Sequence, residues 1–306
     1  MTGYLIARLA QSIVVVLGVL FLVFAILQLT GDPARLMSSP QATLEDIERL
    51  RRQMGFDRPL PEQFLRFFAG AARGDFGRSL RYTDQPALQI VIERFPATVH
   101  LALATLAWSV PVALLLGLVS AVRRRSLSEN VAMMTALLGQ SMPSFWLGLM
   151  LILIFSVNLG LFPSSGRGTP AHVVLPALTL GGFFMARLTR LVRSGLLDVL
   201  GQDYVRTARA KGLAEWVVVA RHAFKNAAIP IVTIVGLDIG TLLGGAVITE
   251  TVFAWPGVGR LAIEAIAARD FPVVQADVFF IALAFVAINL GVDVLYTWLD
   301  PRVRLG

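Results

Sequence analysis

The sequence predicts an all-α, polytopic membrane protein with six transmembrane helices, and three observations lead to this fold class. First, 56% of the 306 residues are hydrophobic and 15% are charged, whereas a soluble domain carries about 25% charged residues. Second, the charged residues cluster and leave uncharged runs of about 20 residues, the length that crosses a bilayer core. Third, the net charge of +7 fits a protein whose basic residues collect on the cytoplasmic side of its spans.

Six apolar runs place the expected spans. They cover Leu9–Leu29, Ala97–Ala121, Val131–Leu159, Ala171–Ala186, Asn226–Thr249 and Ala276–Trp298. The first run exceeds the apolar region of about 7–15 residues in a signal peptide, and Thr30-Gly31-Asp32-Pro33 follows it, so we expect an uncleaved span. Pro143 in the third run and Gly240 and Gly244 in the fifth are compatible with close helix packing or with bending.

The basic residues set the expected orientation. If the N-terminus lies inside, the inner segments are 1–8, 122–130, 187–225 and 299–306, which hold 14 basic and five acidic residues. The two short outer segments hold only Arg167, Arg260 and Arg269. Segment 30–96 carries ten Arg, but long loops hardly report on orientation. We therefore expect both termini in the cytoplasm.

We divide the chain into three parts. Residues 1–30 form the N-terminal tail and first span, residues 31–96 an external subdomain, and residues 97–306 a five-helix core with an inner loop at 196–225 and an outer loop at 250–275. In the external part, Thr43-Leu44-Glu45-Asp46 has the spacing of a capping box and predicts a helix that ends before Gly55. Gly74-Asp75-Phe76-Gly77 predicts a tight turn. A helix lying on the membrane surface is the alternative to a folded subdomain.

The residues of common catalytic sites are missing. A phosphate-binding loop needs Gly-Lys followed by Ser or Thr, but Lys211 and Lys225 are followed by Gly212 and Asn226. There is no Cys for disulfides or thiolate metal sites, and no His is followed by Glu as in the helical zinc-hydrolase motif. We expect no catalytic residue, no metal site and no cofactor bound by this chain.

The inner loop holds the most informative run of residues. Asp203-Tyr204-Val205-Arg206-Thr207-Ala208-Arg209-Ala210-Lys211-Gly212 predicts a short helix with Gly212 just past its end. Arg221-His222-Ala223-Phe224-Lys225-Asn226 then returns the chain to the bilayer, and Pro230 follows. Small side chains let another surface approach the helix, and the basic residues can pair with acidic groups of a cytoplasmic partner. By charge alone, an ordinary basic inner loop is also compatible with this segment.

This run resembles the cytoplasmic EAA loop of binding-protein-dependent ABC importer permeases, in the dipeptide, oligopeptide and nickel branch of the family. The resemblance implies a type I ABC importer transmembrane domain, in which the short helix docks in a groove of an ATPase subunit. The docking residues that it assigns are Asp203, Tyr204, Arg206, Thr207, Ala208, Arg209, Ala210, Lys211 and Gly212, supported by Arg221, His222, Asn226 and Pro230.

The resemblance also covers the external segments. The matching runs are Gly31-Asp32-Pro33-Ala34, Gly74-Asp75-Phe76-Gly77-Arg78-Ser79, the segment 250–261, Arg269-Asp270-Phe271-Pro272-Val273-Val274-Gln275 and Leu299-Asp300-Pro301-Arg302-Val303-Arg304. In the last outer loop it singles out Glu250, Phe253, Pro256, Gly257 and Arg260.

One ionisable residue, Asp238, lies in the middle of the fifth span. The branch commonly has a neutral Gln there. Since an ionisable group at that depth is costly, it usually faces a bundle interior or a watery cavity. Asp238 is therefore either a residue of the translocation path that meets a substrate amine, or a group that only packs two helices. Gln140 and Ser141 of the third span are further candidates for the path.

The resemblance implies half of a translocation path in the bacterial inner membrane. The expected partners are a second homologous permease, two ATP-binding cassette subunits that carry ATP and Mg²⁺, and an external substrate-binding protein, with no nucleic acid. The expected cargo is a short peptide; glutathione, a nickel chelate or an oligosaccharide is the alternative. A secondary transporter would need coupling carboxylates, of which Asp238 is the one central candidate. An intramembrane enzyme is opposed by the missing catalytic residues.

Overall fold

The computed structural model describes residues 2–29, 32, 34–35, 38, 41–82 and 85–299, and most of them are helical. Within these ranges the extended pairing is a single bridge between Arg78 and Pro86, so the predicted all-α class is confirmed. The chain forms two compact units: unit 1 contains Met1–Thr98 and Pro256–Ala287, and unit 2 contains Val99–Trp255 and Ile288–Gly306. The three-part division expected from the sequence stays a prediction.

Unit 1 is built from helices of both chain ends. Its elements are α1 (Thr2–Leu29), α3 (Leu44–Met54), α4 (Leu60–Ala72), α13 (Val258–Ala267) and the unit 1 portions of α5 (Ala87–Val122) and α14 (Phe271–Leu299). The core joins Leu20 of α1, Val91 of α5, Leu261 of α13 and Val273 of α14. Phe24 of α1 packs edge-on against Phe64 of α4, with ring centroids 5.4 Å apart, an arrangement that aromatic rings prefer.

Local signals in the external segment are confirmed. The Thr43 side chain accepts a hydrogen bond from the Asp46 amide at 3.2 Å, and the Asp46 carboxylate accepts one from the Thr43 amide at 3.2 Å, which completes the capping box. The hydroxyl of Thr43 lowers the pKa of Asp46. Gly55 ends α3 with φ 72°, and Gly74 and Gly77 take φ values of 74° and 86°, which only glycine adopts without strain.

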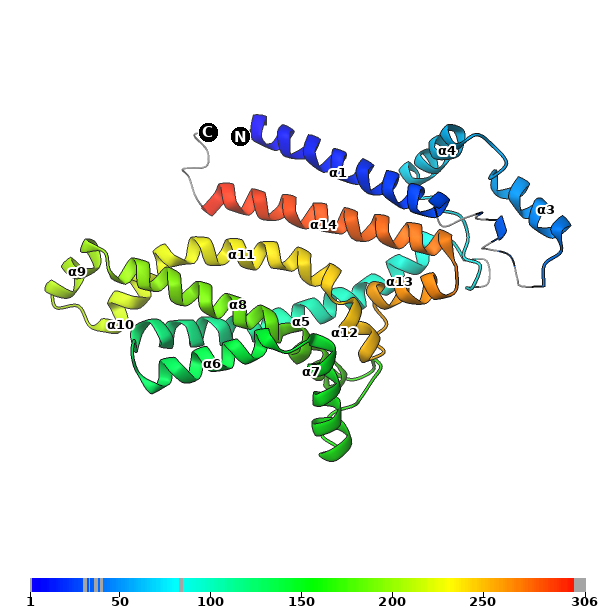
Figure 1. Ribbon diagram of the computed structural model, residues 1–306. Coiled ribbons are helices and arrows are strands. Elements are labelled where there is room, and N and C mark those ends of the chain that lie inside the picture. Colours follow the sequence, from blue (N-terminus) through cyan, green and yellow to red (C-terminus); the bar gives the residue numbers. More distant parts are fainter. Residues whose placement is uncertain are drawn as a thin grey trace. The chain divides into compact units, whose positions relative to one another are not determined.

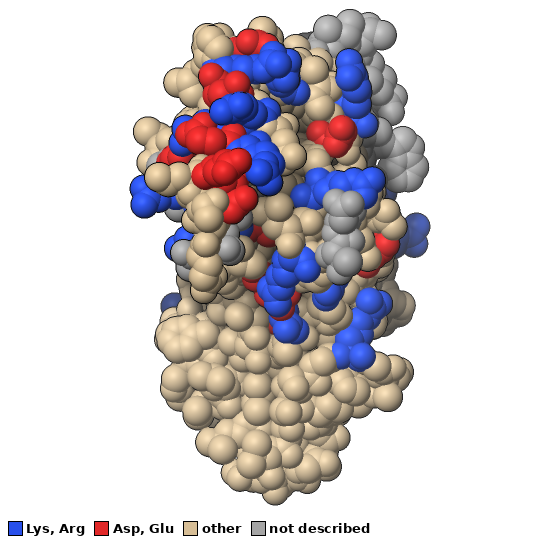
Figure 2. Space-filling model, turned by 90° about the vertical axis from the view of Figure 1, so that its right-hand side faces the viewer, with Lys and Arg blue, Asp and Glu red and all other residues tan. Residues whose placement is uncertain are grey.

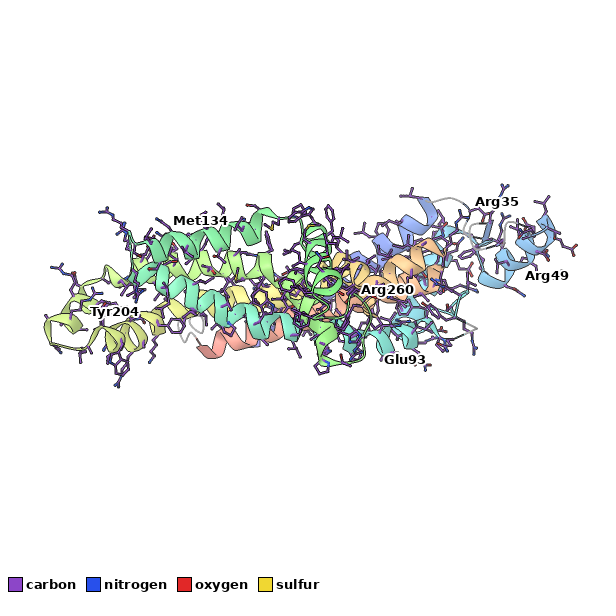
Figure 3. The ribbon with its side chains drawn as sticks, turned by 90° about the horizontal axis from the view of Figure 1, so that it is seen from below. Arg35, Arg49, Glu93, Met134, Tyr204 and Arg260 are labelled. Carbon is purple, nitrogen blue, oxygen red and sulfur yellow. The ribbon has the colours of Figure 1, made fainter. Side chains whose placement is uncertain are left out.

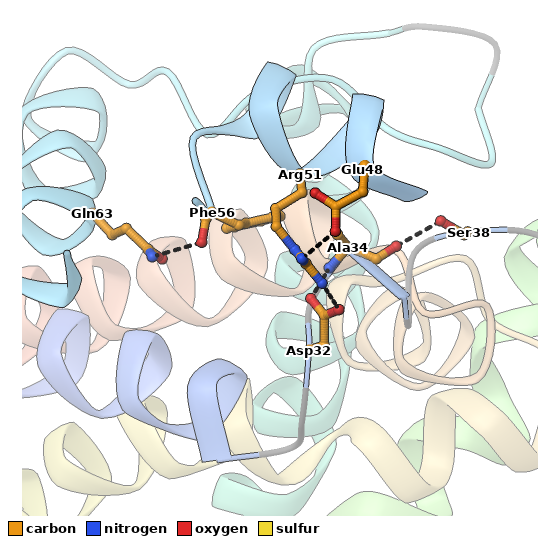
Figure 4. A network of polar contacts seen from close by, with 7 residues as sticks. All are labelled: Asp32, Ala34, Ser38, Glu48, Arg51, Phe56 and Gln63. Atoms are coloured by element: carbon orange, nitrogen blue, oxygen red, sulfur yellow. Dashed lines mark hydrogen bonds and ion pairs between the residues drawn. The ribbon is translucent and has the colours of Figure 1, made fainter. Parts of the chain in front are cut away.

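A polar network ties α3 to the segment that follows α1 (Figure 4). Arg51 pairs with both Asp32 and Glu48, and the Asp32 carboxylate raises the pKa of the Arg51 guanidinium. Asp32 also caps its own turn by accepting from the Ala34 amide at 3.2 Å. Figure 2 shows basic and acidic side chains intermixed on the face that carries α3. Gly31 and Pro33 of the matching motif lie outside the described residues.

Unit 2 is organised around α8. Its elements are α6 (Leu127–Ser141), α7 (Ser144–Leu151), the π-helix η1 (Ile152–Asn158), the 3-10 helix η2 (Pro170–Val173), α8 (Val174–Leu200), α9 (Asp203–Ala210), α10 (Glu215–Val217), the π-helix η3 (Val218–Ala223), α11 (Phe224–Gly245), α12 (Val247–Val252) and the rest of α5 and α14. The core cluster joins Leu188, Val192 and Leu196 of α8 to Ala113 of α5 and Ala227 of α11.

Glycines bring the helices of unit 2 close to α8. A Cβ atom at Gly139 of α6 would lie 2.7 Å from the Gly182 carbonyl oxygen, and one at Gly117 of α5 would lie 2.6 Å from Val192. Gly236 of α11 lies equally close to another helix: a Cβ atom there would lie 2.7 Å from Val292 of α14. Gly244 of α11 has open space around it. Gly236 therefore allows α11 a close approach to α14, whereas Gly244 packs against no other described helix.

Four helices are long and apolar enough to cross a membrane within the described residues: Arg8–Ile26, Ala87–Val122, Pro170–Leu200 and Phe271–Asp293. A fifth span results if the bent pair Leu127–Ser141 and Ser144–Asn158 is one span. Leu9, Ile13, Val14 and Ile26 of the first helix are each more than half exposed, as suits a helix surrounded by lipid. Four or five spans confirm a multi-pass protein; the predicted sixth, at Asn226–Thr249, stays a prediction.

The third expected span is not one straight helix. It breaks at Met142, whose extended backbone (ψ 129°) precedes Pro143, and the two halves are bent by 105°. Proline removes a backbone donor and clashes with the preceding turn. Irregular backbone at membrane depth is tolerated where it is buried in protein or lines a watery cavity.

Gly139→Ala should destabilise unit 2 by about 1–3 kcal/mol, because the new methyl group would meet the backbone of Gly182, which cannot rotate away. The midpoint of thermal unfolding of the purified complex measures the effect. Gly195→Ala is the matched control, since its Cβ would lie 3.9 Å from Ala227. Equal midpoints for the two variants would contradict the close approach of α6 and α8.

Candidate coupling and translocation site

The predicted docking helix forms as expected. It is α9, which lies at the tip of the hairpin between α8 and α11 (Figure 1). Asp203 stands in the first turn, and Gly212 follows the last turn with φ 77° and donates its amide to the Arg209 carbonyl at 2.9 Å. Figure 3 shows Tyr204 at this end of unit 2. The exposed residues of the predicted docking set are Asp203, Tyr204, Arg206, Thr207, Arg209, Ala210, Lys211 and Gly212.

Ala208 differs from the other docking residues because it is buried. Together with Val205 it packs against Val218 of η3, with Val199 and Leu200 of α8 beside them. The sequence pattern assigns Ala208 to the surface that meets a partner, but one helical turn puts it on the same face as Val205. Its small side chain therefore lets α9 lie close to its own chain, and Ala210 is the small residue on the exposed face.

Hydrogen bonds join α9 to the start of α11. The Tyr204 hydroxyl accepts from Asn226 Nδ2 at 2.7 Å and donates to the His222 carbonyl at 3.4 Å. Asn226 also donates to that carbonyl at 3.1 Å. Three of the predicted residues are thus brought together. Arg221 is exposed on η3, and the side chain of Pro230 lies outside the described ones.

An ion pair closes the turn after α9. Arg209 donates from Nη2 and Nε to the two oxygens of Glu215, at 2.7 and 3.1 Å. The hydrogen bonds from Arg209 lower the pKa of Glu215 from its usual 4.5. Because the folded pKa is the lower one, this stabilisation is present above about pH 4.5 and is lost as the pH falls through the folded pKa. Both side chains are substantially exposed, so the pair contributes about 0–1 kcal/mol.

A cavity of about 490 Å³ opens between α7, α8 and α11, at the break of the third span. Asp238 lines it and pairs with Arg187 of α8, with Nη1 and Oδ1 2.8 Å apart. The Asp238 side chain is 5% exposed and the Arg187 side chain 45%. The other carboxylate oxygen of Asp238 is buried and has no hydrogen-bond partner among the described residues. The group that the cavity presents is therefore a guanidinium held by a buried carboxylate.

Gln140 and Ser141 end α6 just before this break. The Ser141 hydroxyl donates to the Leu137 carbonyl at 2.9 Å, and the Gln140 side-chain oxygen is buried. The residues of this bend that line the cavity are Met142, Pro143 and Ser144. A role of Gln140 and Ser141 in the path stays a prediction.

The last outer loop is divided between the two units. In unit 2, Glu250 and Phe253 are buried, and the Phe253 carbonyl accepts from the Gly166 amide at 2.8 Å. In unit 1, Pro256 and Gly257 lead into α13, where Arg260 pairs with Glu264 at 2.8 Å. A role of these residues in transport stays a prediction.

Two segments that carry the family resemblance, one around Ser79 and one around Asp270, meet in unit 1. The Ser79 hydroxyl donates to the buried Asp270 carboxylate, 191 residues further along the chain. The same carboxylate accepts from the Arg81 amide at 3.3 Å, and Tyr82 donates to Glu264 at 3.3 Å. Residues 79–82 are therefore tied to residues 264–270.

A second charge pair, not foreseen from the sequence, joins α6 to α8. Arg193 donates to Glu129 Oε1, from Nε at 3.1 Å and from Nη2, and the Arg125 amide donates to the other oxygen of Glu129. Arg187 and Arg193 count in the sequence only as basic residues of an inner segment. Their partners lie 51 and 64 residues away, which no local pattern indicates.

Comparison with known proteins assigns the class. A family model described as "Binding-protein-dependent transport system inner membrane component" matches residues 113–305, and one described as "Binding-prot-dependent transport system membrane comp, N-term" matches residues 1–102. The chain belongs to this family, the permease subunits of binding-protein-dependent ABC importers. Among its relatives are glutathione transport system permease proteins GsiC of Pectobacterium atrosepticum, 44% identical, and of Escherichia coli strain K12, 42% identical, each over 99% of both chains.

Solved structures support the fold. A chain of the MetNI methionine ABC transporter, in an inward-facing conformation, aligns with a TM-score of 0.57 and 16% identity over 69% of this chain and 97% of that one. A second crystal form gives a TM-score of 0.54 and 20% identity, over 69% and 95%. At these identities the likeness concerns the fold alone, and it agrees with the type I ABC importer transmembrane fold.

Tyr204→Phe should loosen α9. Loss of the hydroxyl removes the hydrogen bond from Asn226, which contributes about 1 kcal/mol, so amide exchange in residues 204–210 should rise by about fivefold. Hydrogen–deuterium exchange on the assembled complex measures it. Trp216→Phe, at a ring 75% exposed, is the control, and unchanged exchange in Tyr204→Phe would show that the hydroxyl does not hold α9.

Proposed function

We propose that this chain is the permease subunit of an ATP-driven importer of glutathione. The observation that carries the proposal is the similarity, at 42–44% identity over 99% of both chains, to permeases named for glutathione transport. A short peptide is the substrate that the sequence pattern favours, with glutathione as an alternative. The relatives support the alternative. Glutathione is itself a small tripeptide, with two carboxylates and one ammonium group.

The coupling helix is proposed to be α9. Its exposed face carries Arg206, Ala210 and Lys211, so small and basic groups are offered to a partner, while its buried face is fixed to α8 and η3 through Val205 and Ala208. The hydrogen bonds of Tyr204 add a connection to α11. A displacement of α9 by an ATPase subunit would therefore be passed to two spans at once, without any chemical step in this chain.

The proposed complex has five chains. A second homologous permease completes the path, two ATP-binding cassette subunits bind and hydrolyse ATP with Mg²⁺, and an external protein delivers the substrate. Both termini and α9 lie in the cytoplasm in this proposal, because the inner segments carry most of the basic residues of the short loops. The chain itself binds neither nucleotide nor metal.

Ala210→Trp should abolish co-purification of the ATPase subunits, because the exposed docking face would carry a bulky ring where a small side chain fits. Pull-down from solubilised membranes measures it, with the amount of permease in the membrane as the reference. Ala72→Trp, at an exposed residue that ends α4 in unit 1, is the matched control and should retain the ATPases. Normal recovery of ATPases with Ala210→Trp would refute α9 as the docking helix.

The complete complex, reconstituted in liposomes with its binding protein, should take up radiolabelled glutathione when ATP is supplied. Uptake should stop when ATP is replaced by a non-hydrolysable analogue. Competition by unlabelled dipeptides at equal concentration compares the two substrate classes. If dipeptides are taken up and glutathione is not, the glutathione assignment fails while the permease assignment stands; uptake that persists without ATP would favour an ion-driven transporter.

A further inference from the structure

Helix α8 is largely buried, and its exposed residues form one stripe that carries charged side chains. Phe183, Arg187 and Arg190 are exposed, whereas Phe184, Met185, Ala186, Leu188 and Thr189 between them are buried. The exposed residues stand four and three positions apart, so they share one helix face. The stripe lies in the second half of the candidate span Pro170–Leu200, which at 31 residues is longer than a bilayer crossing needs. Arginines in or next to a span face a bundle interior or water and avoid lipid, because their transfer into hydrocarbon is costly.

Asp238 uses only part of the hydrogen-bonding capacity of Arg187. The contact between the two groups is a single one, from Nη1 to Oδ1, while a guanidinium has five N–H donors in one plane. Since the Arg187 side chain is 45% exposed, its remaining donors are available to a ligand. A carboxylate is the group that matches two parallel N–H donors of arginine.

The cavity has the size and the setting of a ligand site. Its volume of about 490 Å³ lies in the range of pockets that hold small molecules, about 300–1,000 Å³. The extended backbone at Met142 and Pro143 forms one wall. Asp238 is one of its lining residues, and the second carboxylate oxygen of Asp238, Oδ2, is buried without a hydrogen-bond partner among the described residues, which sets this carboxylate apart from an ordinary buried polar group.

We propose that Arg187, oriented by Asp238, receives a carboxylate of the substrate in the water-filled translocation path. This deepens the proposed function, on which it rests, by naming the substrate group that this chain recognises. Asp238 then acts as a positioning residue. In this proposal it binds Arg187 and does not bind a substrate amine, which was one of the two roles expected from the sequence. The site favours anionic cargo such as glutathione over a cationic peptide.

The absence of Cys allows a direct test. Ser144, which lines the cavity, is changed to Cys in the assembled complex in lipid nanodiscs. The rates of modification by a negatively and a positively charged methanethiosulfonate reagent of similar size are compared. Ser164→Cys, at an exposed position before α8, is the matched control, and the complex without an introduced Cys gives the background.

The ratio of the anionic to the cationic rate at Cys-substituted Ser144 should follow the charge of the pair. We expect Arg187→Gln to lower it by about fivefold, Arg187→Lys to keep it, and Asp238→Asn to keep or raise it. In the double variant Arg187→Gln with Asp238→Asn, the ratio should fall between those of the two single variants, because the pair is again neutral. The double variant also leaves no unpaired carboxylate that could disturb folding. The ratio at Ser164→Cys should not change.

A thiol-blocked analogue, S-methylglutathione, gives the second measurement, since it keeps both carboxylates and cannot react with the reagents. At millimolar concentration it should slow modification of Cys-substituted Ser144, its diethyl ester should not, and the double variant should lose the protection. A rate ratio indifferent to Arg187, or equal protection by acid and ester, would overturn the carboxylate site. Failure of ATP-driven glutathione uptake by the wild-type complex would instead overturn the proposed function, because the reagent ratio does not depend on transport.

Discussion

The burial of α8 is the constraint on which unit 2 depends. Helices α5, α6 and α11 all pack on it, and Gly117, Gly139 and Gly182 allow the approach. In a membrane the hydrophobic effect does not drive helices together, so close packing and hydrogen bonds hold them. With most of its circumference used in this way, α8 has one exposed stripe left, and this stripe carries Arg187 and Arg190.

The same helices carry both parts of the candidate site. At one end of the hairpin, α9 is fixed to α8 by packing and to α11 by the hydrogen bonds of Tyr204. Deeper in unit 2, Arg187 of α8 and Asp238 of α11 form an ion pair at the cavity. Helix α9 and the cavity are therefore connected through two helices.

Proline and extended backbone account for the position of the cavity. The break at Met142 and Pro143 separates α6 from α7 and leaves room beside α8. Such a break would leave backbone groups without partners if it faced lipid. Its place between helices, beside a charged pair, is physically consistent with water in the cavity.

In unit 1, the buried Asp270 plays a different role, because it fixes the turn at Ser79 and Arg81.

The sequence by itself determined the helical membrane class, the family, the capping box at Thr43 and the short helix ended by Gly212. Each of these depends on composition or on residues a few positions apart, which obey local rules of helix geometry. Only the tertiary structure decided that Ala208 faces inward, that the third span bends, and that Asp238 is held by Arg187. These outcomes depend on which helix faces approach each other, and contacts across 51 residues leave no periodic trace in one sequence.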